Sequence, residues 1–551
     1  MNFLERIFER LDEAGGATIV QEIHGQQLIV ATGNDLLSLV ATARRFLVAA
    51  GLQKGERCAL LAANSIRWVA LDLALMTEGI IVVPLYSRQA PGELMAMVRD
   101  SGAARICCES TELRDALLRV HSEAPPVSLF DEIFTPTTGA VAPLKLLPSS
   151  DPVTIIYTSG TSGEPKGVVL NVGNVDHMLS CTTAGLDKLM GARAVPDQVF
   201  HWTPLNFAAS WISLLSYLSR NSVISLSTDL TKLADEMRIA PPNYFLNVPT
   251  LLERVRTKIE DQIRARGGWI AATFSKAKCA YLRRGTNEAH FSDRVSLAIA
   301  NALIFPTIRK GIGPRLKALI CGSAPLSVET QKFFIMLGIP VLQAYGLTET
   351  TAICTLDDPA FVEPGYVGTE IPGIEMKIGE NQEILVRGPN IFPGYWNRPQ
   401  ETATVLRDGW FHTGDQGEVN SRGNWKITGR IKNLIILNSG HNIAPEPIEE
   451  ELAALLPRAE QIVLVGNGRS YLAAIVTTAE NSGLSETEIS GAIDKTNSRL
   501  PHYKQIRAFH VERQPFTIES GLLTAMGKLK REAIAAKMKS QIEELYRKRV
   551  A

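Results

Sequence analysis

A buried strand that breaks into glycine, serine and threonine constrains this chain more than any other stretch. Residues 152–157 read Pro-Val-Thr-Ile-Ile-Tyr, an apolar and β-branched run of the length of a buried strand. Residues 157–168 then read Tyr-Thr-Ser-Gly-Thr-Ser-Gly-Glu-Pro-Lys-Gly-Val. The glycines let main-chain N–H groups turn toward one point, and Lys166 adds a positive charge. These properties suit a loop that holds a polyphosphate, and a flexible turn is the alternative interpretation.

The loop is not a Walker A motif, because that motif needs a lysine followed directly by serine or threonine. Here Pro165 precedes Lys166 and Gly167 follows it. If the loop holds phosphate, the contacts come from hydroxyls, exposed main-chain N–H groups and one ammonium group. The residues that supply them are Thr158, Ser159, Gly160, Thr161, Ser162, Gly163 and Lys166.

Length and composition argue against several classes of protein. A chain of 551 residues exceeds one ordinary core, so we expect two or more domains. Lys+Arg and Asp+Glu both number 57, so the overall charge does not favour nucleic acid. Seven scattered cysteines indicate reduced thiols in a cytoplasmic protein, and the histidine spacing does not suggest a catalytic zinc. The sequence predicts neither a signal peptide nor a membrane helix, which needs roughly 18 apolar residues.

Strands alternate with helices along most of the chain. Residues 58–63 and 80–84 read as buried strands around a helix at 68–76, and later strands end at Gly322 and Gly346. This alternation predicts an α/β fold with doubly wound sheets. Ligands of such sheets bind where strands end and loops begin.

The sequence changes character after Gly365. Short strands, glycine and proline up to Trp425 indicate a small β-barrel-like or antiparallel subdomain, and a compact α+β pattern follows. We predict a large N-terminal domain over residues 1–430 that binds the substrates, and a small mobile C-terminal domain over residues 431–551. A Lys-rich helix from Lys528 to Arg549 closes the second domain.

Two helical segments carry further expectations. Asn34 or Asp35 caps the helix that ends near Gly51. Residues 254–284 hold nine Lys or Arg against Glu260 and Asp261, with apolar side chains interleaved. Two interpretations of this run stay open: a helix face in water, or a basic amphipathic surface that meets anionic lipid.

The order Thr-Ser-Gly-Thr-Ser-Gly-x-Pro-Lys-Gly resembles the signature of the adenylate-forming superfamily, which comprises acyl-CoA synthetases, nonribosomal adenylation domains and luciferases. Four more segments resemble that family in the same order along the chain: 322–325, 343–350, 409–415 with 429–430, and 524–531. The resemblance implies that the 157–168 loop covers the β- and γ-phosphates of ATP and that Lys166 neutralises their charge.

The second and third segments imply the adenine and metal contacts. Tyr345 would lie against adenine beside Gly346, Thr348 would bond the α-phosphate, and Glu349 would help to hold Mg²⁺. A carboxylate and a hydroxyl at a strand end suit this role, because Mg²⁺ takes one or two carboxylates plus phosphate oxygens. The family counterpart of residues Gly322, Ser323, Ala324 and Pro325 packs along the adenine ring.

The last two segments imply the ribose contact and the catalytic lysine. Asp415 resembles the ribose-binding aspartate, and Arg430 its partner. Lys528 resembles the catalytic lysine, with Lys530 as the alternative register. An ammonium aimed at the α-phosphate stabilises the transition state more than the ground state. The family swings its small domain about a hinge, which corresponds here to Lys432.

The implied reaction has two steps in one site. A carboxylate and Mg²⁺-bound ATP give acyl-adenylate and pyrophosphate, and a thiol then releases AMP. The thiol belongs to coenzyme A or to the phosphopantetheine of an acyl carrier protein, and Gly440 would lie beside it.

The basic insert at 254–310, the Asn247–Pro249 segment and the 528–531 ending most resemble bacterial long-chain fatty acyl-CoA synthetases. The implied substrate is a fatty or other hydrophobic acid, whose pocket Asn206 and Phe207 would line. Phe207, like Asn433 and Met526, departs from the family pattern.

Three alternatives stay open: an acyl carrier protein as acceptor, an aryl or cyclic acid as substrate, and a catalytically silent binding subunit. We expect small-molecule partners, no nucleic acid, and a monomer or homodimer in the cytoplasm. Peripheral contact with the inner face of the membrane stays open.

Overall fold

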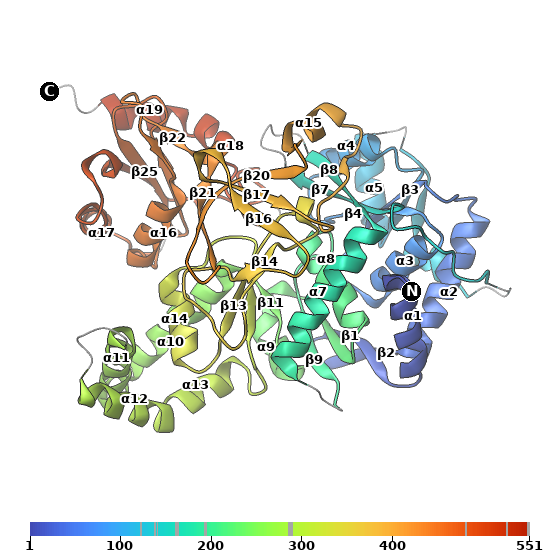
Figure 1. Cartoon of the computed structure of the whole chain (residues 1–551), viewed down its shortest axis with the longest axis horizontal. Coiled ribbons are helices and arrows are strands. Elements are labelled where there is room, and N and C mark those ends of the chain that lie inside the picture. Colours follow the sequence, from blue (N-terminus) through green and yellow to red (C-terminus); the bar gives the residue numbers. More distant parts are fainter. Residues whose placement is uncertain are drawn as a thin grey trace. The chain divides into compact units, whose positions relative to one another are not determined.

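Figure 1 shows the computed structural model of the chain, coloured from the N-terminus in blue to the C-terminus in red. The structure describes residues 1–121, 124–136, 139, 141–159, 165–191, 195–284, 290–479, 482–524 and 527–547. The chain forms two compact units. Unit 1 comprises residues 1–376, 386–411 and 421–424, and unit 2 comprises residues 377–385, 412–420 and 425–551. The sequence boundary at 430/431 stays a prediction.

The first sheet of unit 1 has seven strands in the order β18-β8-β7-β4-β3-β5-β6. Strands β3 to β7 run parallel, whereas β8 and β18 are antiparallel to their neighbours. The strands are β3 (Arg57–Leu61), β4 (Ile81–Leu85), β5 (Arg105–Cys108), β6 (Val127–Leu129), β7 (Pro152–Ser159), β8 (Pro165–Asn171) and β18 (Gly394–Tyr395). The intervening helices are α3 (Ile66–Thr77), α4 (Pro91–Ser101), α5 (Thr111–Val120) and α6 (Phe130–Ile133). The predicted alternation of buried strands and helices is confirmed.

The second sheet has the order β2-β1-β10-β9, with strands at Thr18–His24 (β1), Gln27–Thr32 (β2), Asp197–His201 (β9) and Ser222–Ser227 (β10). Its helices are α1 (Phe3–Ala14), α2 (Gly33–Ala49), α7 (Val172–Met190), α8 (Ala208–Leu218) and α9 (Leu233–Ile239), with η1 (Leu230–Lys232). The expected cap of α2 at Asn34 or Asp35 was wrong. Thr32 is the N-cap, and Asp35 completes a capping box at the third helical position.

The third sheet has the order β11-β12-β13-β14-β15. Its strands are β11 (Leu246–Asn247), β12 (Leu319–Cys321), β13 (Val341–Tyr345), β14 (Thr355–Leu356) and β15 (Thr369–Glu370), and η2 (Thr348–Thr350) follows β13. Five helices belong to this region: α10 (Pro249–Arg266), α11 (Gly268–Arg283), α12 (Phe291–Leu303), α13 (Phe305–Ile312) and α14 (Val328–Met336). One hydrophobic core joins these helices to β12 and β13.

Short strands dominate between residues 365 and 430, as the sequence predicts. They are β16 (Glu375–Ile378), β17 (Glu383–Arg387), β19 (Leu406–Arg407), β20 (Trp410–Val419) and β21 (Trp425–Arg430), with η3 (Glu380–Gln382) and α15 (Pro399–Val405). Strand β20 pairs antiparallel with β19 at one end and with β21 at the other.

Unit 2 is built on the sheet β24-β25-β26, which has strands at Gln461–Val465, Leu472–Thr477 and Ile506–Glu512. Its other elements are η4 (Ile431–Asn433), β22 (Ile435–Ile436), β23 (Asn442–Ile443), α16 (Glu446–Leu455), α17 (Glu486–Asn497), η5 (His502–Lys504), α18 (Arg531–Lys537) and α19 (Lys539–Arg547). The expected single helix from Lys528 was wrong, because a turn with Gly527 at φ +74° precedes α18. A separate C-terminal α+β domain is confirmed.

Candidate active site

Two neighbouring parallel strands bring the predicted adenine and metal residues to one sheet edge. Strands β12 and β13 pair with Cys321 opposite Gln343, so the turns that follow them are neighbours. The backbone there is crowded. A Cβ atom on Gly346 would lie 2.3 Å from the carbonyl oxygen of Ala352, so this position admits only glycine.

The side chains on the two turns differ in exposure. Ser323 adopts φ +75°, and it is exposed together with Ala324 and Pro325 beyond Gly322. Tyr345 is buried at the end of β13. Thr348 and Glu349 are half-buried in η2. The structure therefore places the residues expected near adenine, the α-phosphate and the metal on two adjacent turns.

Tyr395 joins two of the predicted site residues. Its hydroxyl donates a hydrogen bond of 2.8 Å to Oε1 of Glu349, and Nζ of Lys166 lies 5.4 Å from the centre of its ring. Tyr395 reaches this place because β18 pairs with β8. Burial and the Glu349 carboxylate raise the pKa of Tyr395 well above its usual range, so the phenol stays a neutral donor. Cation–π attraction favours a lysine ammonium over such a ring.

Sequence reasoning missed Tyr395 as a site residue. It lies 46 residues from Glu349, and Gly394-Tyr395 reads as an ordinary turn among short strands. The contact depends on strand pairing that no local pattern specifies. A tyrosine beside two site residues is therefore a finding of the structure alone.

The β7–β8 hairpin positions the start and the end of the predicted phosphate loop. Thr158 lies opposite Lys166 in the ladder. The Tyr157 hydroxyl donates to Asp100, which also pairs with Arg398 at 2.7 Å. Gly160, Thr161, Ser162 and Gly163 lie outside the described residues, as does the side chain of Ser159.

Asp415 and Arg430 meet in unit 2. They are direct partners in the β20–β21 ladder, and the Arg430 guanidinium contacts both Asp415 oxygens, at 2.6 and 3.3 Å. Asp415 is 5% exposed, and its backbone N–H donates to the Thr413 hydroxyl. The two hydrogen bonds from the arginine thus hold a buried carboxylate in one orientation.

The predicted hinge and catalytic lysine lie elsewhere in unit 2. Lys432 is the middle residue of η4, and Asn433 donates to Glu446 at 2.6 Å. Lys528 is exposed in the turn that precedes α18, and its backbone N–H donates to the Thr524 hydroxyl. Gly440 adopts φ +82° in the turn between β22 and β23, where a residue with a Cβ would be strained.

The proposed acyl-pocket residues precede helix α8. Phe207 occupies the N-cap position of α8, and Oδ1 of Asn206 is buried without a hydrogen-bond partner in the described structure. Within α8, Trp211 donates to the buried carboxylate of Asp72 at 2.9 Å. Burial raises the pKa of Asp72 to about 7, although the hydrogen bond from Trp211 acts to lower it.

The residues present fit a magnesium ion that is held partly by its substrate. Among the described residues, no cluster of three or more His, Cys, Asp or Glu side chains could hold a metal alone. Glu349 offers one half-buried carboxylate, which accepts a hydrogen bond from Tyr395, and the Tyr395 ring in turn contacts Lys166. Mg²⁺ commonly binds through one carboxylate plus phosphates and water, so a single carboxylate suffices.

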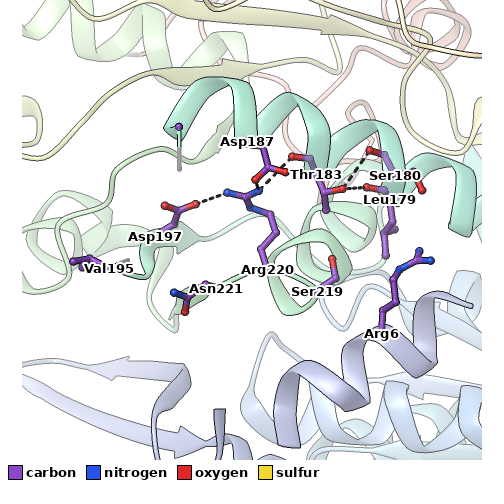
Figure 2. A pocket seen from close by; sticks show the side chains of 11 residues that line it. Arg6, Leu179, Ser180, Thr183, Asp187, Val195, Asp197, Ser219, Arg220 and Asn221 are labelled. Atoms are coloured by element: carbon purple, nitrogen blue, oxygen red, sulfur yellow. Dashed lines mark hydrogen bonds and ion pairs between the residues drawn. The ribbon is translucent and has the colours of Figure 1, made fainter. Parts of the chain in front are cut away.

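Figure 2 shows a different cavity, of about 520 Å³, between α1, α7, the start of β9 and the turn that joins α8 to β10. None of the predicted site residues lines it. Arg220 lines this cavity, but its guanidinium already pairs with Asp187 and, at 2.8 Å, with Asp197. The cavity therefore offers little unneutralised charge for a substrate.

Comparison with known proteins gives two matching family models. The model described as AMP-binding enzyme matches residues 14–396, and the model described as AMP-binding enzyme C-terminal domain matches residues 432–550. Together they cover most of both units.

Curated relatives align over nearly the whole chain. A long-chain-fatty-acid–CoA ligase of Mycobacterium bovis is 27% identical over 590 aligned residues, which cover 99% of this chain and 97% of the relative. A chloroplastic long-chain-fatty-acid–[acyl-carrier-protein] ligase of Arabidopsis thaliana is 29% identical and covers 90% of this chain and 80% of its own length.

Among solved structures, the o-succinylbenzoate coenzyme A synthetase of Bacillus subtilis, in complex with ATP and a magnesium ion, superposes with a TM-score of 0.73. It is 20% identical, over 96% of this chain and 98% of its own. At this identity the superposition establishes the fold alone.

Proposed function

Because this chain belongs to the AMP-binding enzyme family, we propose that it is an AMP-forming acid–thiol ligase. It activates a carboxylic acid with ATP to acyl-AMP, with release of pyrophosphate, and then transfers the acyl group to a thiol with release of AMP. The observation that carries the proposal is the contact of Tyr395 with both Lys166 and Glu349, where Glu349 follows the carboxyl end of β13. A cation, a neutral donor and a carboxylate there suit a triphosphate and its metal.

The residues of unit 1 bind and orient the nucleotide in this proposal. Lys166 neutralises the outer phosphates, the Thr348 hydroxyl bonds the α-phosphate, and Tyr345 lies against the adenine. Glu349 would hold Mg²⁺, which spreads the charge of the phosphates and of the leaving pyrophosphate. Tyr395 fixes the orientation of the Glu349 carboxylate through its hydrogen bond.

Unit 2 supplies the ribose contact and the charge at the reacting phosphorus. Asp415 is held by Arg430, so it presents a fixed carboxylate that can accept bonds from two neighbouring ribose hydroxyls. Lys528 places an ammonium at the α-phosphate while the acid attacks. Rotation about Lys432 then withdraws Lys528, and the turn that carries Gly440 takes its place beside the incoming thiol.

The favoured substrate is a fatty or otherwise hydrophobic acid, and the favoured acceptor is coenzyme A. The relative from Mycobacterium bovis, named as a long-chain-fatty-acid–CoA ligase over nearly the full chain, supports both choices. In this proposal Phe207, at the N-cap of α8, would add an apolar wall where a polar one would suit a small hydrophilic acid. The Arabidopsis relative supports a carrier-protein thiol as the second candidate acceptor.

An acid-panel assay tests the proposal. Purified protein is incubated with ATP, Mg²⁺, coenzyme A and one acid at a time, from short to long fatty acids and aryl acids, while AMP and acyl-thioester are measured. We expect both products in equal amounts with long apolar acids. Replacing coenzyme A by a pantetheinylated carrier protein separates the two acceptors. Absence of AMP with every acid would overturn the proposal.

A further inference from the structure

Helix α12 presents a continuous apolar face to solvent. Four large side chains, each four positions after the previous one, are exposed, and this spacing keeps them on one side of the helix. Ala298 and Ala302 lie between them and are exposed too. The four are Phe291 at 80%, Val295 at 44%, Ile299 at 42% and Leu303 at 61% exposure. We name these four residues the α12 stripe.

The other side of α12 is already committed to the core of unit 1. Ala300 is fully buried, Ile304 just beyond the helix is buried, and Leu297 packs against the same cluster. The next helix is anchored by Phe305, which packs edge-to-face on Phe274 at 6.3 Å. The α12 stripe therefore cannot turn inward without unpacking the core. A helix that is apolar on two sides and buried on one lacks a partner for the second.

The described surroundings of the stripe carry an excess of exposed positive charge. Four exposed basic residues lie there: Lys276 on α11, Arg284 just after α11, Arg294 on α12 and Lys310 on α13. Among the described residues of α10 to α13, the only exposed acid is Asp261, which pairs with Arg264. The chain as a whole has a formal charge of zero, so the excess is local. An apolar stripe inside a basic region is complementary to a surface with anionic groups around an apolar interior.

The buried sides of α12 and α13 leave their outward faces for contact along a surface. Within the described residues no single helix is long and apolar enough to span a membrane. Helices α12 and α13 pass that test only together, and they are bent by 49° at their break. Their buried residues hold them in the core, so only the outward faces are available. On α11, which packs against α12 (Figure 1), Trp269 and Leu282 are exposed as well. Trp residues favour the headgroup level of a bilayer.

We propose that the α12 stripe and its basic surroundings form a docking surface for a membrane of anionic lipid. The stripe inserts into the boundary between headgroups and acyl chains, while the lysine and arginine side chains remain at the headgroups. Docking brings the protein to the phase in which a long-chain acid dissolves, which is the link to the proposed function. The surface itself does not depend on catalysis, so it is tested without ATP or acid.

Vesicle flotation of the full chain tests the proposal. Vesicles of phosphatidylcholine, with or without phosphatidylglycerol, are mixed with wild-type protein and with the triple variant Phe291→Ser, Val295→Ser, Ile299→Ser. We expect wild-type protein to bind the anionic vesicles and to dissociate at high salt. The triple variant should bind at least about tenfold more weakly, because three side chains lose their burial in lipid.

A matched control replaces three exposed apolar helical residues elsewhere: Val48→Ser, Leu118→Ser, Val120→Ser. This control should bind like the wild type, and unchanged circular dichroism and melting temperature should accompany both variants. The proposal is overturned if wild-type protein does not bind anionic vesicles, or if the triple variant binds them as well as the wild type. Dimerisation that only the triple variant loses, without vesicle binding, would instead assign the stripe to a second copy of the chain.

Discussion

The two groups of candidate residues are held in different ways. In unit 1, Lys166, Tyr395 and Glu349 come from segments far apart in the sequence and are linked by a hydrogen bond and a ring contact. In unit 2, Lys528 is exposed in a turn whose backbone bonds to Thr524 close at hand, with Gly527 at a positive φ. One group is fixed by long-range packing and the other by a short local turn.

This difference in how the residues are held suits a nucleotide-binding role for the unit 1 group and a role in the chemical step for Lys528. A nucleotide site gains from side chains that are oriented before the ligand arrives, since ordering them costs free energy. A lysine that acts in one half-reaction and withdraws in the next needs a segment that can move without unpacking a core. The comparison therefore predicts that changes in unit 1 alter affinity, whereas changes at Lys528 alter one chemical step.

The largest expected effect comes from Lys528→Ala. We expect adenylate formation to fall by about a thousandfold, because an electrostatic contact to the transition state is lost. Thioester formation from a supplied acyl-adenylate should remain near the wild-type rate. The two half-reactions are measured separately by pyrophosphate release and by thioester yield.

Lys530→Ala is the matched control, since Lys530 lies two residues further on, at the N-cap of α18. It should retain adenylate formation. Equal loss of both half-reactions in Lys528→Ala would contradict the separation of roles, and a larger loss in Lys530→Ala would move the catalytic assignment to that residue.

A second test concerns two buried carboxylates. In unit 2, Glu449 pairs with Arg531, whereas in unit 1 Asp72 accepts one bond from Trp211 and its other oxygen has no partner in the described structure. The raised pKa of Asp72, about 7, means that the folded state keeps a proton that the unfolded state releases near pH 4. This stability is fully present below about pH 4 and is lost as the pH rises through 7.

Asp72→Asn should therefore flatten the pH dependence of unfolding. Between pH 5 and pH 8 the wild-type free energy of unfolding should fall by about 2–3 kcal/mol more than that of the variant. Urea unfolding followed by tryptophan fluorescence measures it. Buried Asp357, whose pKa is also raised to about 7, titrates in both proteins and cancels in the comparison. Parallel pH profiles would show that Asp72 stays ionised in the fold.

The third expected effect concerns Asp415. Asp415→Asn keeps the shape but removes the charge that Arg430 holds, so the KM for ATP should rise about tenfold while kcat changes little. Steady-state kinetics with varied ATP measures this. Asp408→Asn, at an exposed aspartate nearby in the sequence, should leave KM unchanged. A fall in kcat without a change in KM would argue against a ribose contact.

The smallest expected effect comes from Tyr395→Phe. The variant removes one hydrogen bond to Glu349 but keeps the ring under Lys166, so the Mg²⁺ concentration for half-maximal rate should rise about fivefold. Calorimetric titration of the protein with Mg²⁺-bound ATP should show a parallel loss of its affinity for the nucleotide. Tyr366→Phe, at a half-buried tyrosine elsewhere in unit 1, serves as the control and should leave the Mg²⁺ requirement unchanged. An unchanged Mg²⁺ requirement would mean that Tyr395 only packs.

Local patterns in the sequence predicted much of this molecule. The run at 152–157 lies in β7, and the strands predicted before Gly322 and Gly346 are β12 and β13. Short apolar β-branched runs between turns favour buried strands over other secondary structure. The pairing of Asp415 with Arg430 also appears in the ladder. The expected roles of these residues rest on resemblance and stay predictions.

Features that depend on pairing at long range were not predictable. Tyr395 reaches Glu349 only through the register of β18 on β8. The sequence does not show which side of α12 is buried, and only the fold reveals it. Thr32, Asn34 and Asp35 are all residue types that cap helices, and the sequence alone does not fix at which of them the helix starts.

ATP–pyrophosphate exchange tests the central claim most directly, because it reports acyl-adenylate formation without any thiol. With a long-chain acid present, purified protein should incorporate labelled pyrophosphate into ATP, and the exchange should disappear when the acid or Mg²⁺ is withheld. Exchange that never depends on an added acid, across the whole panel, would contradict the assignment of this chain as an acid-activating enzyme.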